Sequence, residues 1–416
     1  MGRVIVVGGG AAGMAAALSA SYEGAEVLLL EQNEKLGKKV YITGKGRCNV
    51  TNAGTVEDLF SHAVSHPKFL QSAFHRFTNR DLMDLLEANG CPLVVERGNR
   101  VFPSSGHASD VIRCFERMLR DAGVRIRFQS RVTGLKKSAS RILGVALKDF
   151  TEPLSALVLA TGGISYPLTG STGDGLRFSK DLGHTITPLY PSLVGLCCLE
   201  PWCALLSGLT LKNVEVSAVD ASGKRIRTEE GELLFTHRGV SGPTVLRLSA
   251  YLTKRIHLGE KIRLFIDLKP ALSADTLDLR LQREFQEAGT KEIKNMMGRL
   301  VPVSLSAVIL SEARIAETLR ACDVNREQRK ALLGALKGLS LTVTGTGGFE
   351  EAIVTQGGIS VDEIDPSTMR SRLYENLFFA GEMIDVDLMT GGYSLQEAWS
   401  TGWLAGRNAA REASKA

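Results

Sequence analysis

The sequence predicts an α/β protein, in which a parallel-sheet domain built from both ends of the chain is interrupted by other parts. Two observations support this. Short β-branched runs alternate with an Ala-rich helical run near the N-terminus, and an apolar strand followed by a long helix returns near the C-terminus. Between them the chain changes to a β-rich and then a charge-rich helical pattern, and 416 residues suit two or three domains of about 150. We expect three parts: residues 1–190 with 350–416, 191–270 with 339–349, and 271–338.

The first elements form a βαβ unit. Arg3–Val7 is a short apolar run typical of a strand covered by helices on both faces of its sheet. Gly8–Gly13 predicts a tight turn, Met14–Tyr22 a helix and Ala25–Leu30 a second strand, which Glu31 ends.

The following elements mix loop, helix and strand. Residues 35–54 are basic and polar without periodicity, which favours a loop. Helices are predicted at 56–63, 67–74, 79–89 and 108–122, and strands at 93–96, 99–102, 124–128, 131–135, 142–147 and 156–160.

The remaining predicted elements lie in the middle part of the chain and near its C-terminus. Strands are expected at 192–200, 208–219, 224–229, 232–236 and 261–268, and a helical pattern covers 274–338. Strand character returns at 353–364 and 377–380, and a last helix covers 394–410. Gly345–Gly348 lacks the spacing of a nucleotide-binding motif, so we interpret it as a turn.

Composition excludes several classes of protein. The formal charge of +5 does not indicate a dedicated nucleic-acid-binding protein, and the seven cysteines show no CxxC spacing. We therefore expect reduced thiols and no metal site. No stretch of 18 apolar residues is present, and the first apolar run, Val4–Val7, is too short for a signal peptide. We therefore also expect no membrane-spanning helix and a cytoplasmic protein. Glycine is in excess, with 43 residues against 12 prolines, which predicts many tight turns or close approaches of backbone to a ligand.

The strongest motif is Gly8-x-Gly10-x-x-Gly13. Gly8 allows the turn, Gly10 lets backbone approach a pyrophosphate, and Gly13 lets helix and sheet pack closely. The helix N-terminus offers free N–H groups to phosphates. Glu31, 18 residues later, suits a ribose hydroxyl and disfavours a 2′-phosphate. The motif therefore predicts a bound dinucleotide.

Two later segments favour FAD over NAD. Ala160-Thr161-Gly162-Gly163 ends a buried strand, and Gly381-Glu382 is followed by Asp385 and by Gly391-Gly392-Tyr393 at a helix start. These segments look like those of two-dinucleotide-type flavoproteins, in which the acid can meet the ribityl hydroxyls of FAD. The helix N-terminus can face N1–C2=O of the flavin there, which stabilises the anionic reduced form. No second GxGxxG motif with an acid is present, so a nicotinamide donor would bind transiently.

The chain also resembles a known family, on segments that include Lys38–Asn52, Arg100–Ser105, Gly170–Gly175 and Gly231–Pro243. These segments are similar to those of the BaiN/RdsA family of FAD-dependent oxidoreductases. The resemblance covers nearly the whole chain. The resemblance implies a Rossmann-type FAD-binding domain with an inserted β-barrel-like domain and a helical subdomain. The chain departs from the family pattern at Leu388 and Ser394, where the family has Gly and Asn.

Residues expected to contact FAD come from these motifs and from the resemblance. They are Gly8, Gly10, Ala11, Ala12, Gly13, Glu31, Gln32, Lys39, Gly44, Arg47, Cys48, Asn49, Val132, Ala160, Thr161, Gly162, Gly381, Glu382, Asp385, Gly391, Gly392, Tyr393 and Ser394.

Family chemistry implies reduction of a carbon–carbon double bond conjugated to a carbonyl, with NAD(P)H as the expected electron donor. The favoured substrate is a 3-oxo bile acid or steroid enone, and the alternative is uridine in 23S ribosomal RNA. An amine oxidase, and a flavin-binding protein without turnover, are further alternatives. The candidate proton donors are Cys48, His237 and Tyr393.

Overall fold

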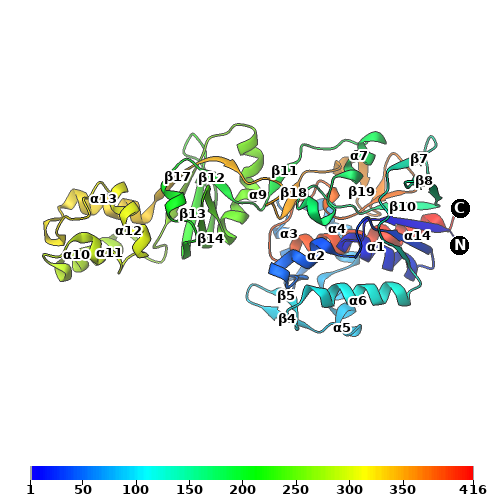
Figure 1. The fold of residues 1–416 in the computed structure, drawn as a ribbon, viewed down its shortest axis with the longest axis horizontal. Coiled ribbons are helices and arrows are strands. Elements are labelled where there is room, and N and C mark those ends of the chain that lie inside the picture. The colour runs from blue at the N-terminus through cyan, green and yellow to red at the C-terminus, as the bar shows by residue number, and fades with distance from the viewer. Residues whose placement is uncertain (1, 416) are drawn as a thin grey trace. The chain divides into compact units, whose positions relative to one another are not determined.

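The computed structural model describes residues 2–415, which form two compact units (Figure 1). One unit runs to Pro191 and resumes at Phe349, and the other is Ser192–Gly348. Each unit is described by itself below.

A seven-stranded sheet is the centre of the first unit, in the order β19-β20-β21-β10-β1-β2-β6. Strands β6, β2, β1, β10 and β21 run parallel to one another, whereas β20 pairs antiparallel with β19 and β21. The strand bounds are β1 Arg3–Val7, β2 Glu26–Leu30, β6 Arg125–Arg127, β10 Ala156–Leu159, β19 Ile364–Asp365, β20 Arg370–Ser371 and β21 Leu377–Phe379.

The strand order creates a switch point between β1 and β10. From β1 the chain proceeds to β2 and β6 on one side, and it later returns to β10 and β21 on the other. Val7 of β1 is level with Leu159 of β10, so the turn after β1 and the segment after β10 leave the same sheet edge together. Open parallel sheets bind ligands at such a point, outside the carboxyl ends of the strands.

Helices α1 (Ala11–Tyr22) and α14 (Tyr393–Ala413) lie side by side (Figure 1). Their contact leaves no room for side chains at two glycines of α14. A Cβ on Gly402 would lie 2.2 Å from the Ala12 carbonyl oxygen, and one on Gly406 would lie 2.0 Å from that of Ala16. Both helices advance by four residues between these contacts, so they run in the same direction. The ends of the chain are therefore joined through the core of this unit.

The remaining helices of the first unit surround this core. Helix α6 contributes Phe115, whose ring stacks on Trp399 of α14 at 4.6 Å. Capping boxes at Thr55 and Thr78 fix the starts of α3 and α5. The bounds are α3 Val56–Ser61, α4 Gln71–Arg76, α5 Asn79–Ala88, α6 Ala108–Asp121 and α7 Asp174–Asp181.

Two small antiparallel sheets flank these helices, and one was only partly predicted. Residues 35–54 are not a continuous loop, because they contain α2 (Lys38–Ile42) and β3 (Thr51–Asn52). The sheet order is β3-β5-β4 in one and β7-β8-β9 in the other. Bounds are β4 Leu93–Glu96, β5 Arg100–Pro103, β7 Gly134–Lys137, β8 Ile142–Ala146 and β9 Thr151–Pro153.

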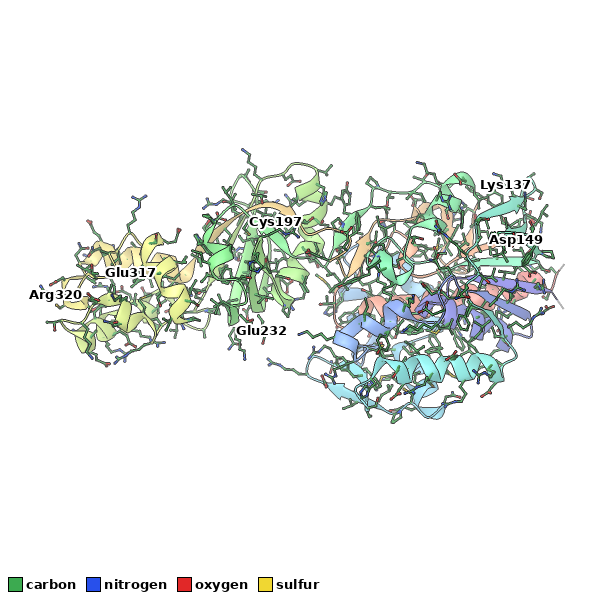
Figure 2. All side chains as sticks on the ribbon, in the orientation of Figure 1. Lys137, Asp149, Cys197, Glu232, Glu317 and Arg320 are labelled. Atoms are coloured by element: carbon green, nitrogen blue, oxygen red, sulfur yellow. The ribbon has the colours of Figure 1, made fainter. Side chains whose placement is uncertain are left out.

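The second unit combines a closed barrel with helices. The barrel order is β12-β15-β14-β13-β16-β17, and its inward residues join the helices in one hydrophobic core. In Figure 2, Cys197 and Glu232 come from the barrel, and Glu317 and Arg320 come from the helical part. The bounds are β12 Leu196–Cys198, β13 Thr210–Val219, β14 Arg225–Thr236, β15 Gly239–Ser241, β16 Ile262–Asp267, β17 Leu339–Thr346, α8 Trp202–Leu205, α9 Pro243–His257, α10 Ala274–Ala288, α11 Ile293–Met297, α12 Val303–Glu312 and α13 Arg326–Lys337.

Local expectations for the second unit were wrong in three places. The strands predicted at 224–229 and 232–236 are one strand, β14. Gly345 and Thr346 belong to β17 rather than to a turn. Helix α9 was not predicted, although Pro243 at its first turn is a common start signal for a helix.

Candidate functional site

The turn after β1 combines two crowded glycines with an open one. A Cβ on Gly13 would lie 1.7 Å from the Gly8 carbonyl oxygen, and Gly8 itself has φ of +105°. Gly10, in contrast, has nothing within 4 Å of its Cβ position and caps α1 without a side-chain hydrogen bond. The turn is therefore closely packed at Gly8 and Gly13 and open at Gly10. There the N–H groups in the first turn of α1 are available to an anion.

Glu31 lies beside this turn and is 6% exposed. Its Oε2 accepts the Gly9 N–H at 2.6 Å, and its Oε1 accepts the backbone and side-chain N–H of Asn33 at 2.8 and 2.7 Å. The side chain of Gln32 donates to the Gly170 carbonyl at 2.5 Å. A carboxylate has about four acceptor positions, so Glu31 retains capacity for a ribose hydroxyl.

Lys39 and Glu382 form an ion pair next to the strand ends. The Lys39 Nζ lies 2.6 Å from Glu382 Oε2 and also donates to the Ser165 hydroxyl at 2.7 Å. Glu382 Oε1 accepts the Ser165 hydroxyl at 2.9 Å and the Thr355 N–H at 2.8 Å. Four segments distant in the sequence are thus connected through one carboxylate.

Replacing Lys39 tests this connection. We expect Lys39→Met to lower the free energy of unfolding by about 2 kcal/mol, below the 3–5 kcal/mol of a fully buried pair, because both side chains are about one-fifth exposed. Urea unfolding measures it. Lys38→Met is the matched control, since Lys38 pairs with the exposed Glu34, and a change of at most about 0.5 kcal/mol is expected. Equal effects of the two changes would contradict this.

Helix α14 extends past the open position at Gly10. Gly402 contacts Ala12 at the start of α1, and Gly392, the N-cap of α14, precedes it by ten residues. At 1.5 Å per residue, the start of α14 lies about 15 Å beyond the contact along the helix axis. A ligand with its phosphates at α1 therefore has a second helix N-terminus within reach of its other end.

The start of α14 is locked against β3. A Cβ on Gly392 would lie 2.3 Å from the Thr51 carbonyl. The Asn49 side-chain oxygen, in the orientation that satisfies its neighbours, accepts the Gly392 N–H at 2.9 Å. Asn52 Nδ2 donates to the Gly391 carbonyl at 3.1 Å and to the Gly98 carbonyl at 3.0 Å. The β4–β5 hairpin is therefore adjacent to the glycine pair.

Two buried acids near this helix start were missed by the sequence analysis. Asp387 is 4% exposed, and burial, with Asp385 nearby, raises its pKa to about 7. Glu397 is 3% exposed, and burial raises its pKa to about 8, with Glu382 and Asp387 adding to the shift. The sequence does not show that these acids are buried. The one sequence feature that could have identified them as site residues is that both lie near the Gly391-Gly392 segment.

The predicted proton donors occupy different environments. Cys48 is fully buried with φ of +59°, and burial raises its pKa to about 12. Tyr393 is 7% exposed, stacks on His62 at 4.0 Å, and has a pKa raised by burial. His237 is exposed in the turn between β14 and β15 of the second unit. The three are not brought together within one unit.

Other predicted contacts lie in different environments within the protein. Arg47 pairs with Glu96 at 2.5 Å and stacks on Phe102 at 4.2 Å. The Thr161 hydroxyl is buried against Gly175 of α7, and Val132 is buried in the core. These residues stay predictions as cofactor contacts.

Residues 2–415 contain neither a cluster of three metal-ligating side chains nor a helix long and apolar enough to cross a membrane.

The chain matches a family of known proteins. The family model described as the HI0933-like protein Rossmann domain matches residues 2–408. The chain belongs to this family. It is 31% identical over 413 residues to the 3-dehydro-bile acid delta(4,6)-reductase of Clostridium scindens, covering 99% of each chain. It is 30% identical to the ribosomal RNA dihydrouridine synthase of Escherichia coli, covering 97% of each chain.

Solved structures agree at the level of the fold. A 3-ketosteroid delta1-dehydrogenase from Sterolibacterium denitrificans has a TM-score of 0.52 at 12% identity and covers 99% of this chain and 100% of its own. A 3-ketosteroid-delta4-(5alpha)-dehydrogenase from Rhodococcus jostii has a TM-score of 0.51 at 15% identity, covering 98% and 96%.

The family and the residues agree on FAD. The opening at Gly10 suits a pyrophosphate, Glu31 suits a ribose, and α14 offers a second helix N-terminus. The HI0933-like chain is accordingly a flavoprotein oxidoreductase with a Rossmann-type FAD-binding domain and a six-stranded antiparallel barrel.

Proposed function

We propose that this enzyme reduces a carbon–carbon double bond conjugated to a ketone in a 3-oxo bile acid or related steroid, with NAD(P)H as electron donor. The observation that carries the proposal is the match to the bile acid reductase over 99% of both chains. When bound, reduced FAD supplies the hydride. The protein must hold the cofactor, orient the enone and provide a proton.

Residues of the first unit are assigned to the parts of FAD. Gly8, Gly10 and Gly13 with α1 would hold the pyrophosphate, and Glu31 would hold the adenosine ribose. Glu382, oriented by Lys39, would bind the ribityl hydroxyls. The start of α14 at Gly392 would favour the anionic reduced flavin through the positive end of its helix dipole.

Reduction of uridine in ribosomal RNA is the second candidate. It is supported by the match to the ribosomal RNA enzyme and by the β4–β5 hairpin, which exposes Arg97 and Arg100. Asn52 connects this hairpin to Gly391 at the start of α14. Arginines at this place suit RNA phosphates, and they equally suit the carboxylate of a bile acid.

Anaerobic turnover decides between the two candidates. We expect NADH or NADPH to bleach the bound flavin, and an unsaturated 3-oxo bile acid to restore its absorbance with formation of the saturated product. Unmodified 23S ribosomal RNA fragments are the competing substrate. Reoxidation by RNA alone would replace the first candidate by the second, and reoxidation by neither would reject both.

Two further readouts address the remaining alternatives. Bleaching of the oxidised flavin by amines would indicate an amine oxidase. Failure of both nicotinamides and dithionite to bleach the flavin would indicate a binding protein without turnover.

A further inference from the structure

The first unit contains a pocket with two free thiols in its lining. The pocket has a volume of about 260 Å³ and is formed by the turn after α5, the end of β5 and helix α6. Cys91 and Cys114 line it, and each is a free cysteine that is 2% exposed. None of the lining residues is among those assigned to FAD. The pocket is therefore a candidate site with a chemistry of its own.

The end of α5 brings the two cysteines together. The Cys91 N–H donates to the Leu86 carbonyl at 2.9 Å, and the Cys114 thiol lies 3.9 Å from the same oxygen. The Cys114 thiol also donates to the Asn89 carbonyl at 3.4 Å, and its sulfur accepts a hydrogen bond from the Cys91 thiol. Two side chains that meet in this way have the proximity that a disulfide requires.

The charged side chains of the pocket favour an ionised thiol at Cys114. Arg113 pairs with Asp110, whereas Arg117 donates to a neutral backbone carbonyl, which leaves its charge uncompensated by that contact. The Arg117 Nη2 lies 4.0 Å from the Cys114 Sγ. The hydrogen bond from Cys91 lowers the pKa of Cys114, and Arg117 adds to this shift against the opposing effect of burial. Reactive cysteines lie in such electropositive surroundings.

A second pair of thiols provides a comparison within the same chain. Cys198 and Cys203 of the second unit are also hydrogen-bonded to each other. The charge that acts on both of them is the Glu200 carboxylate, which opposes their ionisation. A carboxylate also repels an anionic reagent. Comparing the two pairs therefore separates the effect of thiol proximity from the effect of a positive charge.

We propose that Cys91 and Cys114 are a reversible modification site, at which small disulfides that carry carboxylates oxidise the two thiols to a disulfide. Arginine side chains suit the carboxylates of such a reagent, and Arg113 and Arg117 both line the pocket. This site does not depend on the proposed function of the enzyme.

The reaction has two exchange steps. The Cys114 thiolate attacks one sulfur of the small disulfide, whose sulfur–sulfur bond breaks, and the departing thiolate takes up a proton. The Cys91 thiol then loses its proton to water, and its sulfur attacks the Cys114 Sγ. The second small thiolate leaves and takes up a proton. Two protein thiols are thus oxidised by two electrons, and one small disulfide is reduced to two thiols.

Peptide mapping of the FAD-loaded protein tests the proposal. The protein is incubated anaerobically with oxidised glutathione, its remaining thiols are alkylated in urea, and it is digested without reduction. We expect linked peptides containing Cys91 and Cys114, formed at least about tenfold faster than any link between Cys198 and Cys203. Dithiothreitol should reverse the link. Glutathione bound to the exposed Cys322, with Cys91 and Cys114 both alkylated, would overturn the proposal.

Variants test the two steps separately. Cys91→Ser lacks the second thiol, so glutathione should remain on Cys114 as a mixed disulfide. Arg117→Gln should slow the reaction with oxidised glutathione by at least about fivefold, and Arg117→Lys, which keeps the charge, should recover most of the rate. Arg120→Gln is the matched control, because it removes an exposed arginine of α6 that does not line the pocket. Its rate should equal that of the wild type.

The charge of the reagent provides the last test. Cystamine is a small disulfide with two ammonium groups, and each reagent's rate is divided by its rate with free cysteine. On this scale the wild type should react faster with oxidised glutathione than with cystamine, and Arg117→Gln should reduce the difference. A preference for cystamine, or a wild-type rate in Arg117→Gln, would overturn the proposed class of reagent. Because the mapping uses the wild type, the proposal stays testable even if Cys91→Ser fails to fold.

Discussion

Gly13→Ala is expected to unfold or severely destabilise the first unit, whereas Gly10→Ala is expected to leave the fold intact and abolish tight FAD binding. The added methyl at Gly13 would lie 1.7 Å from the Gly8 carbonyl oxygen, far inside van der Waals contact. Since that oxygen belongs to backbone between β1 and α1, it cannot move alone. We expect a loss of more than about 3 kcal/mol in the free energy of unfolding.

A substitution at Gly10 should affect FAD binding with little effect on the stability of the fold. Its φ of −81° suits any residue, and nothing lies within 4 Å of its Cβ position. Alanine there should cost the apoprotein no more than about 1 kcal/mol, as a poorer N-cap. The methyl would occupy the space at the N-terminus of α1 that a pyrophosphate needs, so FAD affinity should fall by at least about 100-fold, or about 2.7 kcal/mol.

Urea unfolding of the apoproteins and fluorescence titration with FAD measure the two effects. Gly334→Ala within α13 is the control, because its Cβ also meets nothing within 4 Å and its backbone is helical. It should slightly stabilise the protein and leave FAD binding unchanged. Wild-type FAD affinity in Gly10→Ala would show that the opening at Gly10 does not hold the pyrophosphate.

The sequence was most informative where local rules and tertiary structure agree. The first βαβ unit was predicted because its β-branched runs and its glycine spacing leave few alternatives, and Val4–Val7 indeed lie in the sheet core. Residues 35–54 were expected to be a loop because their polar composition gives no helix or strand pattern. The segment nevertheless contains α2 and β3, and these elements depend on contacts with distant parts of the chain. β3, for example, pairs with β5 at Thr51 and Val101.

The missed site residues have a common physical reason. Asp387 and Glu397 look like ordinary surface acids in the sequence, and only the packing of distant segments buries them. Asp387 is covered from residues 63–65 and 356–357, and Glu397 by the helix interface that includes Gly381 and Thr401. Because no local pattern encodes burial by tertiary packing, the pKa shifts could not be predicted.

Glu397→Gln is expected to remove a large part of the pH dependence of stability. Burial raises the pKa of Glu397 from its ordinary 4.5 to about 8, so the folded protein keeps the proton that the unfolded chain releases. The stabilisation is complete below pH 4.5, falls as the pH rises, and is lost as the pH passes about 8. Between pH 4.5 and 7 the wild type should lose about 3 kcal/mol from this group alone.

Urea unfolding of wild type and Glu397→Gln between pH 5 and 8.5 tests this. The difference between the two unfolding free energies should grow with pH in favour of the variant, while Glu87→Gln on exposed α5 follows the wild type. Asp387, with a pKa raised to about 7, contributes in the same direction, so Asp387→Asn should remove a further part of the slope. Parallel curves for wild type and Glu397→Gln would mean that Glu397 is ionised in the folded protein.

The location of Glu397 gives this pH dependence a functional consequence. Its Oε1 lies 3.3 Å from the Thr401 hydroxyl, which accepts the Gly381 N–H at 3.0 Å. Gly381 begins the segment that carries Glu382 and Asp387, and both of these carboxyls raise the pKa of Glu397. Ionisation of Glu397 would therefore add a like charge beneath the proposed flavin site. The variant should consequently keep its bound FAD to a higher pH than the wild type, as measured by flavin released on ultrafiltration.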